Sequence, residues 1–243
     1  MKRIVDVVVA SAGLLACLPL LTVFSLLVWL EDRRSPVYVP LRVGRHGTPF
    51  RMLKLRSMVV GADQSKVDST ASQDARITRI GRVMRRSKFD ELPQLWNVLV
   101  GQMSLVGPRP NIDRETALYS HIEQRLLSIR PGITDIASIV FADEGEILNG
   151  HEDANIAYNQ LIRPYKSSLG LLYVDHASLA LDLELMALTV FNAVNRPAVL
   201  NRLANRVQAL GADDALVQVV RRESPLIPAP PPGHREIVRS RGA

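Results

Sequence analysis

The sequence of 243 residues predicts a mostly helical α+β protein that is held in a membrane at its N-terminus. Residues 4–30 form a long apolar run, residues 37–55 have the pattern of a short β-hairpin, and later segments place apolar residues at helical spacing. The chain accordingly divides into a membrane segment at 1–34 and a domain at 35–200. A polar tail rich in Pro and Arg, expected to be partly disordered, follows at 201–243.

The apolar run is long and carries a single charged side chain, Asp6, in 27 positions. A straight helix of this length would extend roughly 40 Å, which exceeds the ~30 Å hydrocarbon core of a bilayer. Basic residues flank both ends, at 2–3 and 33–34, so the positive-inside rule favours neither orientation of a span. Pro19 removes a backbone donor near the middle and favours a kink or break. We therefore expect a re-entrant helix hairpin, with a plain transmembrane anchor kinked at the proline as the alternative.

Four later segments have helical patterns. A short helix is predicted at 77–86, and a second begins at or near Asp90, because Pro93 is tolerated only in a first helical turn. Amphipathic helices are predicted at 114–129 and 181–194. In an anchored protein, such helices either lie flat in the membrane interface or pack on one another.

Positive charge is concentrated after the apolar run. The net charge is +6, but the stretch from Arg33 to Lys88 holds fourteen Lys/Arg and three Asp/Glu, a local balance of +11. Such a block fits nucleic acid, an anionic lipid surface or a phosphorylated substrate. The scarcity of aromatic residues in the block, together with the membrane segment, argues against nucleic acid. The single Cys17 excludes an intramolecular disulfide, and the five histidines lack the spacing of a zinc site.

The adjacent carboxylates Asp90 and Glu91 are the strongest chemical candidates. They end the cationic stretch at a predicted helix N-terminus, which favours anions. The arginines just upstream should lower a carboxylate pKa and keep the group ionised. An ionised carboxylate near bound phosphate can act as a nucleophile or as a Mg²⁺ ligand. The alternative is an ordinary acidic helix cap.

Several basic residues are placed for phosphate binding. Two prolines flank Arg109 and fix its guanidinium in a stiff loop, although the tetrapeptide 107–110 also suits a surface turn. Lys54 and Arg56 alternate with leucines, so a strand would direct both cations to one face. Arg130 precedes Pro131-Gly132 and is fixed in a similar way.

Taken together, these motifs resemble the monotopic phosphoglycosyl transferases, a family of bacterial sugar transferases, over about residues 2–195. The run DELPQLWNVL…MSLVGPRP within residues 77–110 is highly specific for that family. The other motifs are KRIVD at 2–6, RVGRHGTPF at 42–50, KLRSM at 54–58, RPGIT at 130–134 and the pattern Ser178…Asp182-Leu183…Thr189.

The resemblance implies a re-entrant membrane helix hairpin and a small domain with interfacial helices on the cytoplasmic face of the bacterial inner membrane. It also implies Mg²⁺-dependent ping-pong chemistry, in which Asp90 attacks the β-phosphorus of a UDP-sugar, releases UMP and passes the phosphosugar to polyprenyl (undecaprenyl) phosphate. Glu91 would be a Mg²⁺ ligand. Membrane lipids are implied partners and a homodimer is allowed, while nucleic acid is not expected. The implied substrate- and phosphate-binding residues are Lys54, Arg56, Arg85, Arg86, Arg109 and Arg130.

Three departures from the family pattern leave the sugar open. Leu18 precedes Pro19 where relatives usually carry Ser, Gly170 replaces a late Asp, and residues 135–145 replace a Gln-Val-Asn-Gly-Arg segment. Asp135 could supply a substitute carboxylate. The alternative to an enzyme is a membrane-anchored, non-catalytic regulator that binds lipid or glycan, and the intact Asp90-Glu91 pair argues against it.

Overall fold

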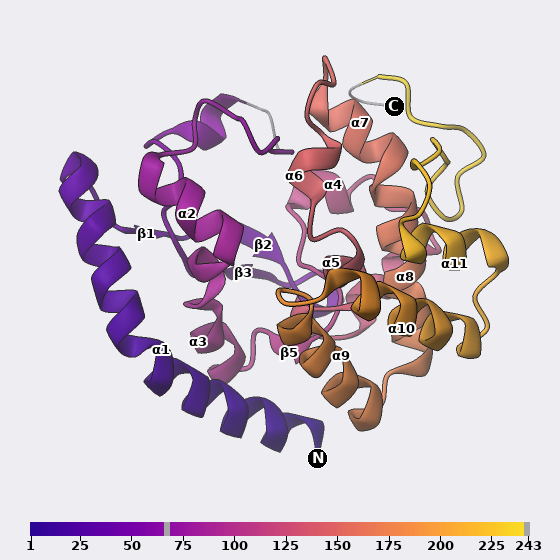
Figure 1. Cartoon of the computed structure of the whole chain (residues 1–243), viewed down its shortest axis with the longest axis horizontal. Coiled ribbons are helices and arrows are strands. Elements are labelled where there is room, and N and C mark those ends of the chain that lie inside the picture. The colour runs from indigo at the N-terminus through magenta and orange to yellow at the C-terminus, as the bar shows by residue number, and fades with distance from the viewer. Residues whose placement is uncertain (66–68, 241–243) are drawn as a thin grey trace.

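A single long helix, α1 (Lys2–Asp32), lies along the outside of a body of shorter helices and small two-stranded sheets (Figure 1). This computed structural model describes residues 1–65 and 69–240. The other helices are α2 (Arg79–Ser87), α3 (Gln94–Leu99), α4 (Asp113–Thr116), α5 (Ile136–Val140), α6 (Glu144–Ile147), α7 (Ala154–Leu161), α8 (Arg163–His176), α9 (Leu179–Phe191), α10 (Arg196–Ala209) and α11 (Asp214–Arg221). The strands are β1 (Val37–Tyr38), β2 (Leu41–Val43), β3 (Pro49–Arg51), β4 (Lys54–Leu55), β5 (Ser104–Val106) and β6 (Gly132–Thr134). The mostly helical α+β class is confirmed.

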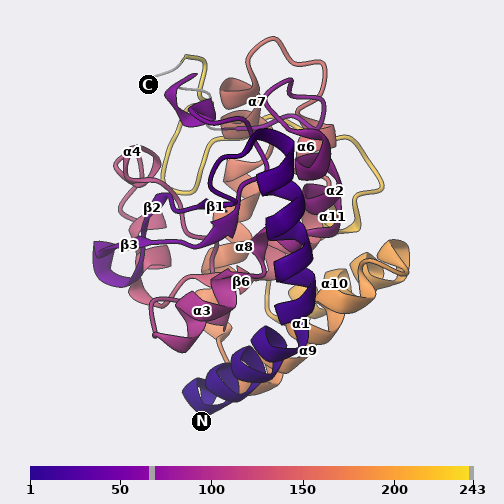
Figure 2. The same ribbon diagram turned by 90° about the vertical axis from the view of Figure 1, so that its left-hand side faces the viewer.

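Helix α1 passes through Pro19 and changes direction near its middle, as Figures 1 and 2 show. A proline inside a helix lacks one backbone hydrogen bond, which accounts for a kink. Only Asp6, Ala10 and Val28 of this helix are buried, so it is no core helix of a soluble domain. By length and composition it is apolar enough to cross a membrane. The predicted long apolar helix is therefore present, with a bend near Pro19.

The N-terminal end of α1 is bonded to the body. The Lys2 ammonium contacts the Asp182 carboxylate of α9 at 2.5 Å. The buried Asp6 carboxylate accepts from the Ser104 hydroxyl at 2.9 Å and from the backbone N–H of Leu105 at 3.0 Å. A buried carboxylate needs such partners, and here they join α1 to β5.

The C-terminal end of α1 is bonded to the same body. Both nitrogens at the tip of the Arg56 guanidinium donate to the two oxygens of Asp32, at 2.7 and 2.6 Å. Glu31 accepts from the backbone N–H of Arg79 at 2.9 Å, at the start of α2. Arg33 then ends the helix in the left-handed conformation, with φ of 58°. The two ends of the apolar helix are thus fixed to one domain.

The predicted β-hairpin is formed by β2 and β3, which pair antiparallel around a turn at 44–48. Next to it, β1 pairs antiparallel with β4. The parallel pair β5–β6 was not anticipated, and it brings two proline-containing loops together. The backbone N–H of Gly132 donates to Pro108 at 3.0 Å, and a Cβ on Gly107 would lie 2.4 Å from the Arg130 carbonyl oxygen. Glycine is required for this close approach.

The predicted helices at 77–86 and 181–194 are confirmed as α2 and α9. The prediction of one helix at 114–129 is wrong, because α4 ends at Thr116 and a separate 3₁₀ turn spans Glu123–Ser128. Ser120 causes the interruption. Its hydroxyl accepts from the backbone N–H of Glu123, and the Glu123 carboxylate accepts from the backbone N–H of Ser120, both at 3.1 Å. This reciprocal capping starts a new turn inside the apolar pattern.

The C-terminal helices complete the core. Residues 201–221, which the sequence assigned to a polar tail, form most of α10 and all of α11. Leu203, Val207 and Val220 of these helices are fully buried in the main hydrophobic cluster. The Pro-rich stretch after α11 is extended and contacts α7 and α8. The Tyr165 hydroxyl of α8 donates to the Ile227 carbonyl at 2.6 Å, and the backbone N–H of Ala229 donates to the Gln160 carbonyl of α7 at 3.1 Å.

Candidate active site

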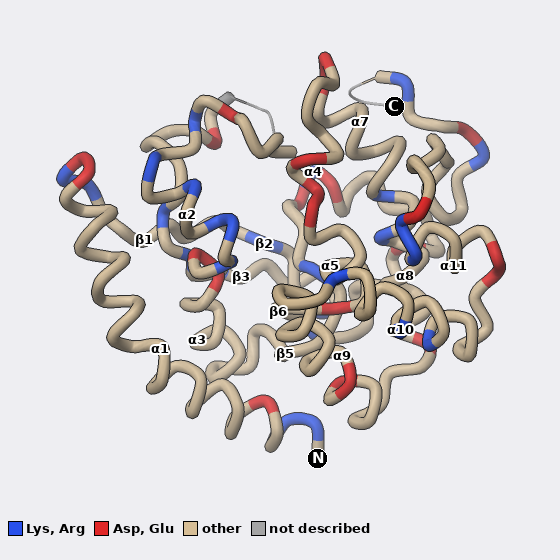
Figure 3. The backbone as a smooth tube through the Cα atoms, in the orientation of Figure 1, with Lys and Arg blue, Asp and Glu red and all other residues tan. Residues whose placement is uncertain are grey.

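A cavity of about 960 Å³ lies between the strands and α2 on one side and α4, α6, α7 and α8 on the other. Asp90 is in its wall, together with the predicted phosphate-binding residues Lys54, Arg56, Arg85 and Arg109. The structure therefore brings together residues that are up to 55 positions apart in the chain. Figure 3 shows Lys and Arg gathered along α2 and the neighbouring strands, and Asp and Glu gathered near α4.

The acidic pair lies in a tight turn between two helices. Lys88, with φ of 60°, ends α2, and a 3₁₀ turn over Phe89–Glu91 follows. Helix α3 begins only at Gln94, so the predicted helix start at or near Asp90 lies four residues before the first residue of the α-helix. The turn buries both carboxylates, leaving Asp90 6% and Glu91 8% exposed.

Glu91 is fully engaged by cations. Its Oε1 accepts from Lys54 Nζ at 3.0 Å and from Arg109 Nη2, and its Oε2 accepts from Arg109 Nη1 at 3.2 Å. Burial opposes ionisation, but Arg109 and Lys54 outweigh it and hold the pKa of Glu91 well below its usual range. Glu91 is thus a permanent anion that fixes both cations at the cavity.

Asp90 differs from its neighbour in having no hydrogen-bond partner for its carboxylate within the described residues. Burial raises the pKa of Asp90, the Lys54 ammonium opposes this shift and the Glu91 anion adds to it. The pKa of Glu91 is lowered as expected, but by Arg109 and Lys54 and not by the arginines just upstream. For Asp90 the expectation is wrong, because burial outweighs the opposing effect of Arg85. Asp90 is therefore the carboxylate left free for a ligand or for chemistry.

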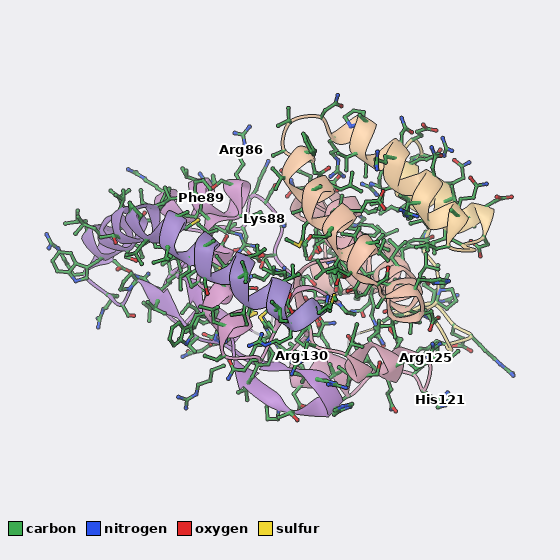
Figure 4. The ribbon with its side chains drawn as sticks, turned by 90° about the horizontal axis from the view of Figure 1, so that it is seen from below. Arg86, Lys88, Phe89, His121, Arg125 and Arg130 are labelled. Atoms are coloured by element: carbon green, nitrogen blue, oxygen red, sulfur yellow. The ribbon has the colours of Figure 1, made fainter. Side chains whose placement is uncertain are left out.

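The other predicted basic residues lie in different surroundings. Arg56 lines the cavity, but its donors are engaged by Asp32 and by the Ser35 carbonyl at 2.7 Å. Arg85 is half-buried at the cavity wall. Arg86 is exposed and projects outward from α2, well separated from Arg130 in Figure 4. Arg130 is also exposed, and its Nε donates to the Gly101 carbonyl at 2.9 Å. The substrate contacts of these residues stay predictions.

Two departures from the family pattern have structural explanations. Asp135 caps α5, accepting from the backbone N–H of Ser138 at 2.6 Å, and it lies outside the cavity lining. It therefore supplies no substitute carboxylate to this cavity. Gly170 packs within α8, where a Cβ would lie 2.8 Å from a methyl of Leu126.

The cavity is also lined by residues that the sequence did not reveal: Arg42 of β2, and, on the wall opposite the strands, Glu115, Glu144, Tyr158 and Lys166. Arg42 belongs to the RVGRHGTPF motif, which was a usable signal. The others come from four separate helices, and no local spacing links them.

The implied Mg²⁺ can be tested against these side chains. Within the described residues, no group of three or more His, Cys, Asp or Glu side chains could hold a metal ion. Mg²⁺ is commonly bound by one or two carboxylates together with substrate phosphates, so a complete protein cage is not required. The uncommitted Asp90 carboxylate fits such a shared ion, whereas Glu91 would share its oxygens with Lys54 and Arg109.

Buried carboxylates with shifted pKa values are common at functional sites, and the cations around this pair suit a phosphorylated ligand. The chain belongs to the bacterial sugar transferase family, whose model matches residues 1–196.

Named relatives agree with this membership. The chain is 33% identical over 201 residues to the UDP-glucose:undecaprenyl-phosphate glucose-1-phosphate transferase of Klebsiella pneumoniae, covering 81% of this chain and 41% of that one. It is 49% identical over 109 residues to a Bacillus subtilis (strain 168) protein provisionally named undecaprenyl-phosphate N-acetylgalactosaminyl 1-phosphate transferase, covering 45% of this chain and 61% of that one. It is 36% identical over 191 residues to the uncharacterized sugar transferase EpsL of the same organism, and the match covers 78% of this chain and 85% of that one. The chain thus spans less than two thirds of the first two relatives.

Proposed function

We propose that this protein transfers a phosphosugar from a UDP-sugar to undecaprenyl phosphate or a similar polyprenyl phosphate, giving a polyprenyl diphosphosugar and UMP. Such a reaction is the membrane-committed first step of polysaccharide or glycan assembly. Family membership and the names of the relatives support the reaction class. The observation that carries the proposal is the free Asp90 carboxylate beside a Glu91 that Lys54 and Arg109 hold in place.

In the proposed mechanism, an Asp90 oxygen attacks the β-phosphorus of the donor. The bond from that phosphorus to the oxygen bridging the two phosphates breaks, and UMP leaves with the electron pair. The resulting aspartyl phosphosugar is then attacked by an oxygen of polyprenyl phosphate, which restores the Asp90 carboxylate. Lys54 and Arg109 are placed to stabilise negative charge that develops on the transferred phosphoryl group. A Mg²⁺ ion, when bound, would neutralise charge on the donor phosphates.

We further propose that α1 is re-entrant and that the domain lies on the cytoplasmic face of the inner membrane. Lys2 and Asp6 fix one end of α1 to the domain, and Asp32 fixes the other. A straight span would place these ends on opposite sides of a bilayer, roughly 30 Å apart. The bend of α1 lets both ends stay with one domain while the apolar middle enters the lipid (Figure 2).

The chemical step is tested by Asp90→Asn. The variant should release no UMP when UDP-sugar and undecaprenyl phosphate are supplied, because an amide is no nucleophile here. Asp175→Asn, on the outer surface of α8 and paired with Arg125, serves as the matched control and should keep its activity. A donor-only reaction of the parent protein, quenched during turnover, should show a sugar-phosphate adduct on Asp90 by mass spectrometry. Turnover by Asp90→Asn at the parent rate would contradict the covalent mechanism.

The topology is tested separately by labelling. With Cys17 replaced by Ala, Lys2→Cys and Arg34→Cys should each react with a membrane-impermeant thiol reagent only from the cytoplasmic side. Reaction of the two from opposite sides would show that α1 is a simple span.

A further inference from the structure

The wall of the cavity opposite the acidic pair has its own cluster of polar side chains. Glu144 of α6, Tyr158 of α7 and Lys166 of α8 all line the cavity. The Lys166 ammonium is paired with Glu144 Oε2 and lies 5.4 Å from the centroid of the Tyr158 ring. Three consecutive helices thus present an anion, a hydroxyl and a cation to one place.

These groups keep hydrogen-bonding capacity that the described protein does not use. Tyr158 is only 8% exposed, yet its hydroxyl has no hydrogen-bond partner within the described residues. Glu144 Oε1 and two of the three Lys166 N–H groups are likewise without partners in that part of the chain. None of these atoms is among the fully buried atoms of the described residues that lack a partner, so each is accessible at the cavity and can bond to a ligand there.

The charge of this wall differs from that around Asp90. Lys54, Arg85 and Arg109 make the Asp90 side cationic, which suits phosphate. On the opposite wall, Glu144 and Glu115 offset Lys166. Two carboxylates would repel a phosphate group, whereas a mixture of donors and acceptors matches vicinal hydroxyls, each of which donates and accepts.

We propose that Glu144, Tyr158 and Lys166 form a hydroxyl-recognition subsite that binds a hydroxyl-bearing ring of the UDP-sugar donor. The inference rests on the proposed function, because it takes the donor as the ligand of this cavity. Either the transferred sugar or the ribose of the nucleotide offers the required chemistry. Glu144 accepts from one ring hydroxyl, Lys166 donates to another, and the Tyr158 hydroxyl contacts a third position.

The sharpest test is Tyr158→Phe, which removes one oxygen and keeps the ring that packs against Lys166. Tyr165→Phe is the matched control, because its hydroxyl bonds to the Ile227 carbonyl and the residue does not line the cavity. We expect Tyr158→Phe to lower kcat/KM for the best donor about 10-fold, mainly through KM, as for one lost hydrogen bond. Tyr165→Phe should leave kcat/KM unchanged. Glu144→Gln, which keeps the side-chain shape, should also raise KM.

The choice of donor distinguishes the two rings. The panel consists of UDP-glucose, UDP-galactose and UDP-N-acetylgalactosamine, with UMP as a product inhibitor. If the subsite binds the transferred sugar, Tyr158→Phe affects the donors unequally and leaves inhibition by UMP unchanged. If it binds ribose, all donors lose the same factor and UMP inhibits correspondingly less.

Binding measured on the Asp90→Asn background keeps this inference separate from the reaction itself. Weaker donor binding after adding Tyr158→Phe supports the subsite whether or not the parent protein releases UMP. A parent that binds UDP-sugars but never releases UMP contradicts the proposed transfer alone. Equal affinity with and without the Tyr158 hydroxyl, for every donor and for UMP, overturns the subsite.

Discussion

The two walls of the cavity use charged side chains in opposite ways. Around Asp90, Glu91 holds Lys54 and Arg109 by direct ion pairs, so the cations are fixed before any substrate arrives. Around Tyr158, the Glu144–Lys166 pair leaves donors and acceptors free, and opposite charges cancel. Under the proposed function, the fixed cations of the first wall suit the stabilisation of developing negative charge, and the free polar groups of the second wall suit the selection of a substrate.

Loss of a cation that Glu91 holds in place should lower turnover more than any change in the opposite wall. Arg109→Met removes two hydrogen bonds to Glu91 and, in the proposed mechanism, a cation beside the reacting phosphate, so kcat/KM for UMP release should fall by roughly 10²- to 10³-fold. Arg130→Met, outside the cavity, should change kcat/KM much less. An equal loss in Arg130→Met would show that the cationic wall extends beyond the present cavity.

The second largest effect should be on the pH dependence of turnover, which variants in the two walls should change differently. In the proposed mechanism Asp90 must be ionised to attack phosphorus, and its pKa lies above the ordinary 3.8 because of burial. UMP release should therefore fall about tenfold per pH unit below that raised pKa. Lys54→Met should move this acid limb to higher pH, because Lys54 favours the ionised form of Asp90. Glu144→Gln should leave the limb in place. Rates of UMP release by the parent and the two variants, measured across an acidic pH series, test these expectations.

The smallest expected effect is a change in thermal stability on removing the buried charge of Asp90. A carboxyl group whose folded pKa is raised above its unfolded value destabilises the folded state at pH values above the folded pKa. Asp90→Asn should therefore raise the Tm at neutral pH by a few degrees, roughly 2–4 °C for each 1 kcal/mol. The gain should disappear as the pH falls below the ordinary pKa of a carboxyl group. Thermal unfolding at the two pH values measures it, and a lower Tm at neutral pH would contradict the assigned burial cost.

Much of the cationic wall could be predicted because its signals are local. The Asp90-Glu91 pair, the proline-flanked Arg109 and the strand alternation at Lys54 each depend on a few neighbouring residues. Pro19 acts on its own helix in the same way, so the bend of α1 was also predictable.

The rest depends on distant contacts. Glu123 is fully buried, paired with Arg163 at 2.8 Å and bonded to Ser167 at 2.7 Å, and these partners 40 or more positions away stabilise the turn that breaks the expected helix. The sequence predicted that Arg56 binds phosphate, but in the structure its guanidinium donates to the Asp32 carboxylate. Tyr158 and Lys166 gave no local pattern, because only the packing of α6, α7 and α8 brings them to Glu144.

The double attachment of α1 also bears on acceptor choice. Under the proposed re-entrant arrangement, the contacts Lys2–Asp182 and Asp32–Arg56 set how high the reaction centre stands above the hydrocarbon. The enzyme would then recognise the acceptor by the depth of its phosphate at the membrane surface. The far end of the isoprenoid tail would stay in the lipid and make no contact with the protein. Acceptors with fewer or more isoprene units should accordingly serve almost equally well, provided that each still anchors its headgroup at the surface.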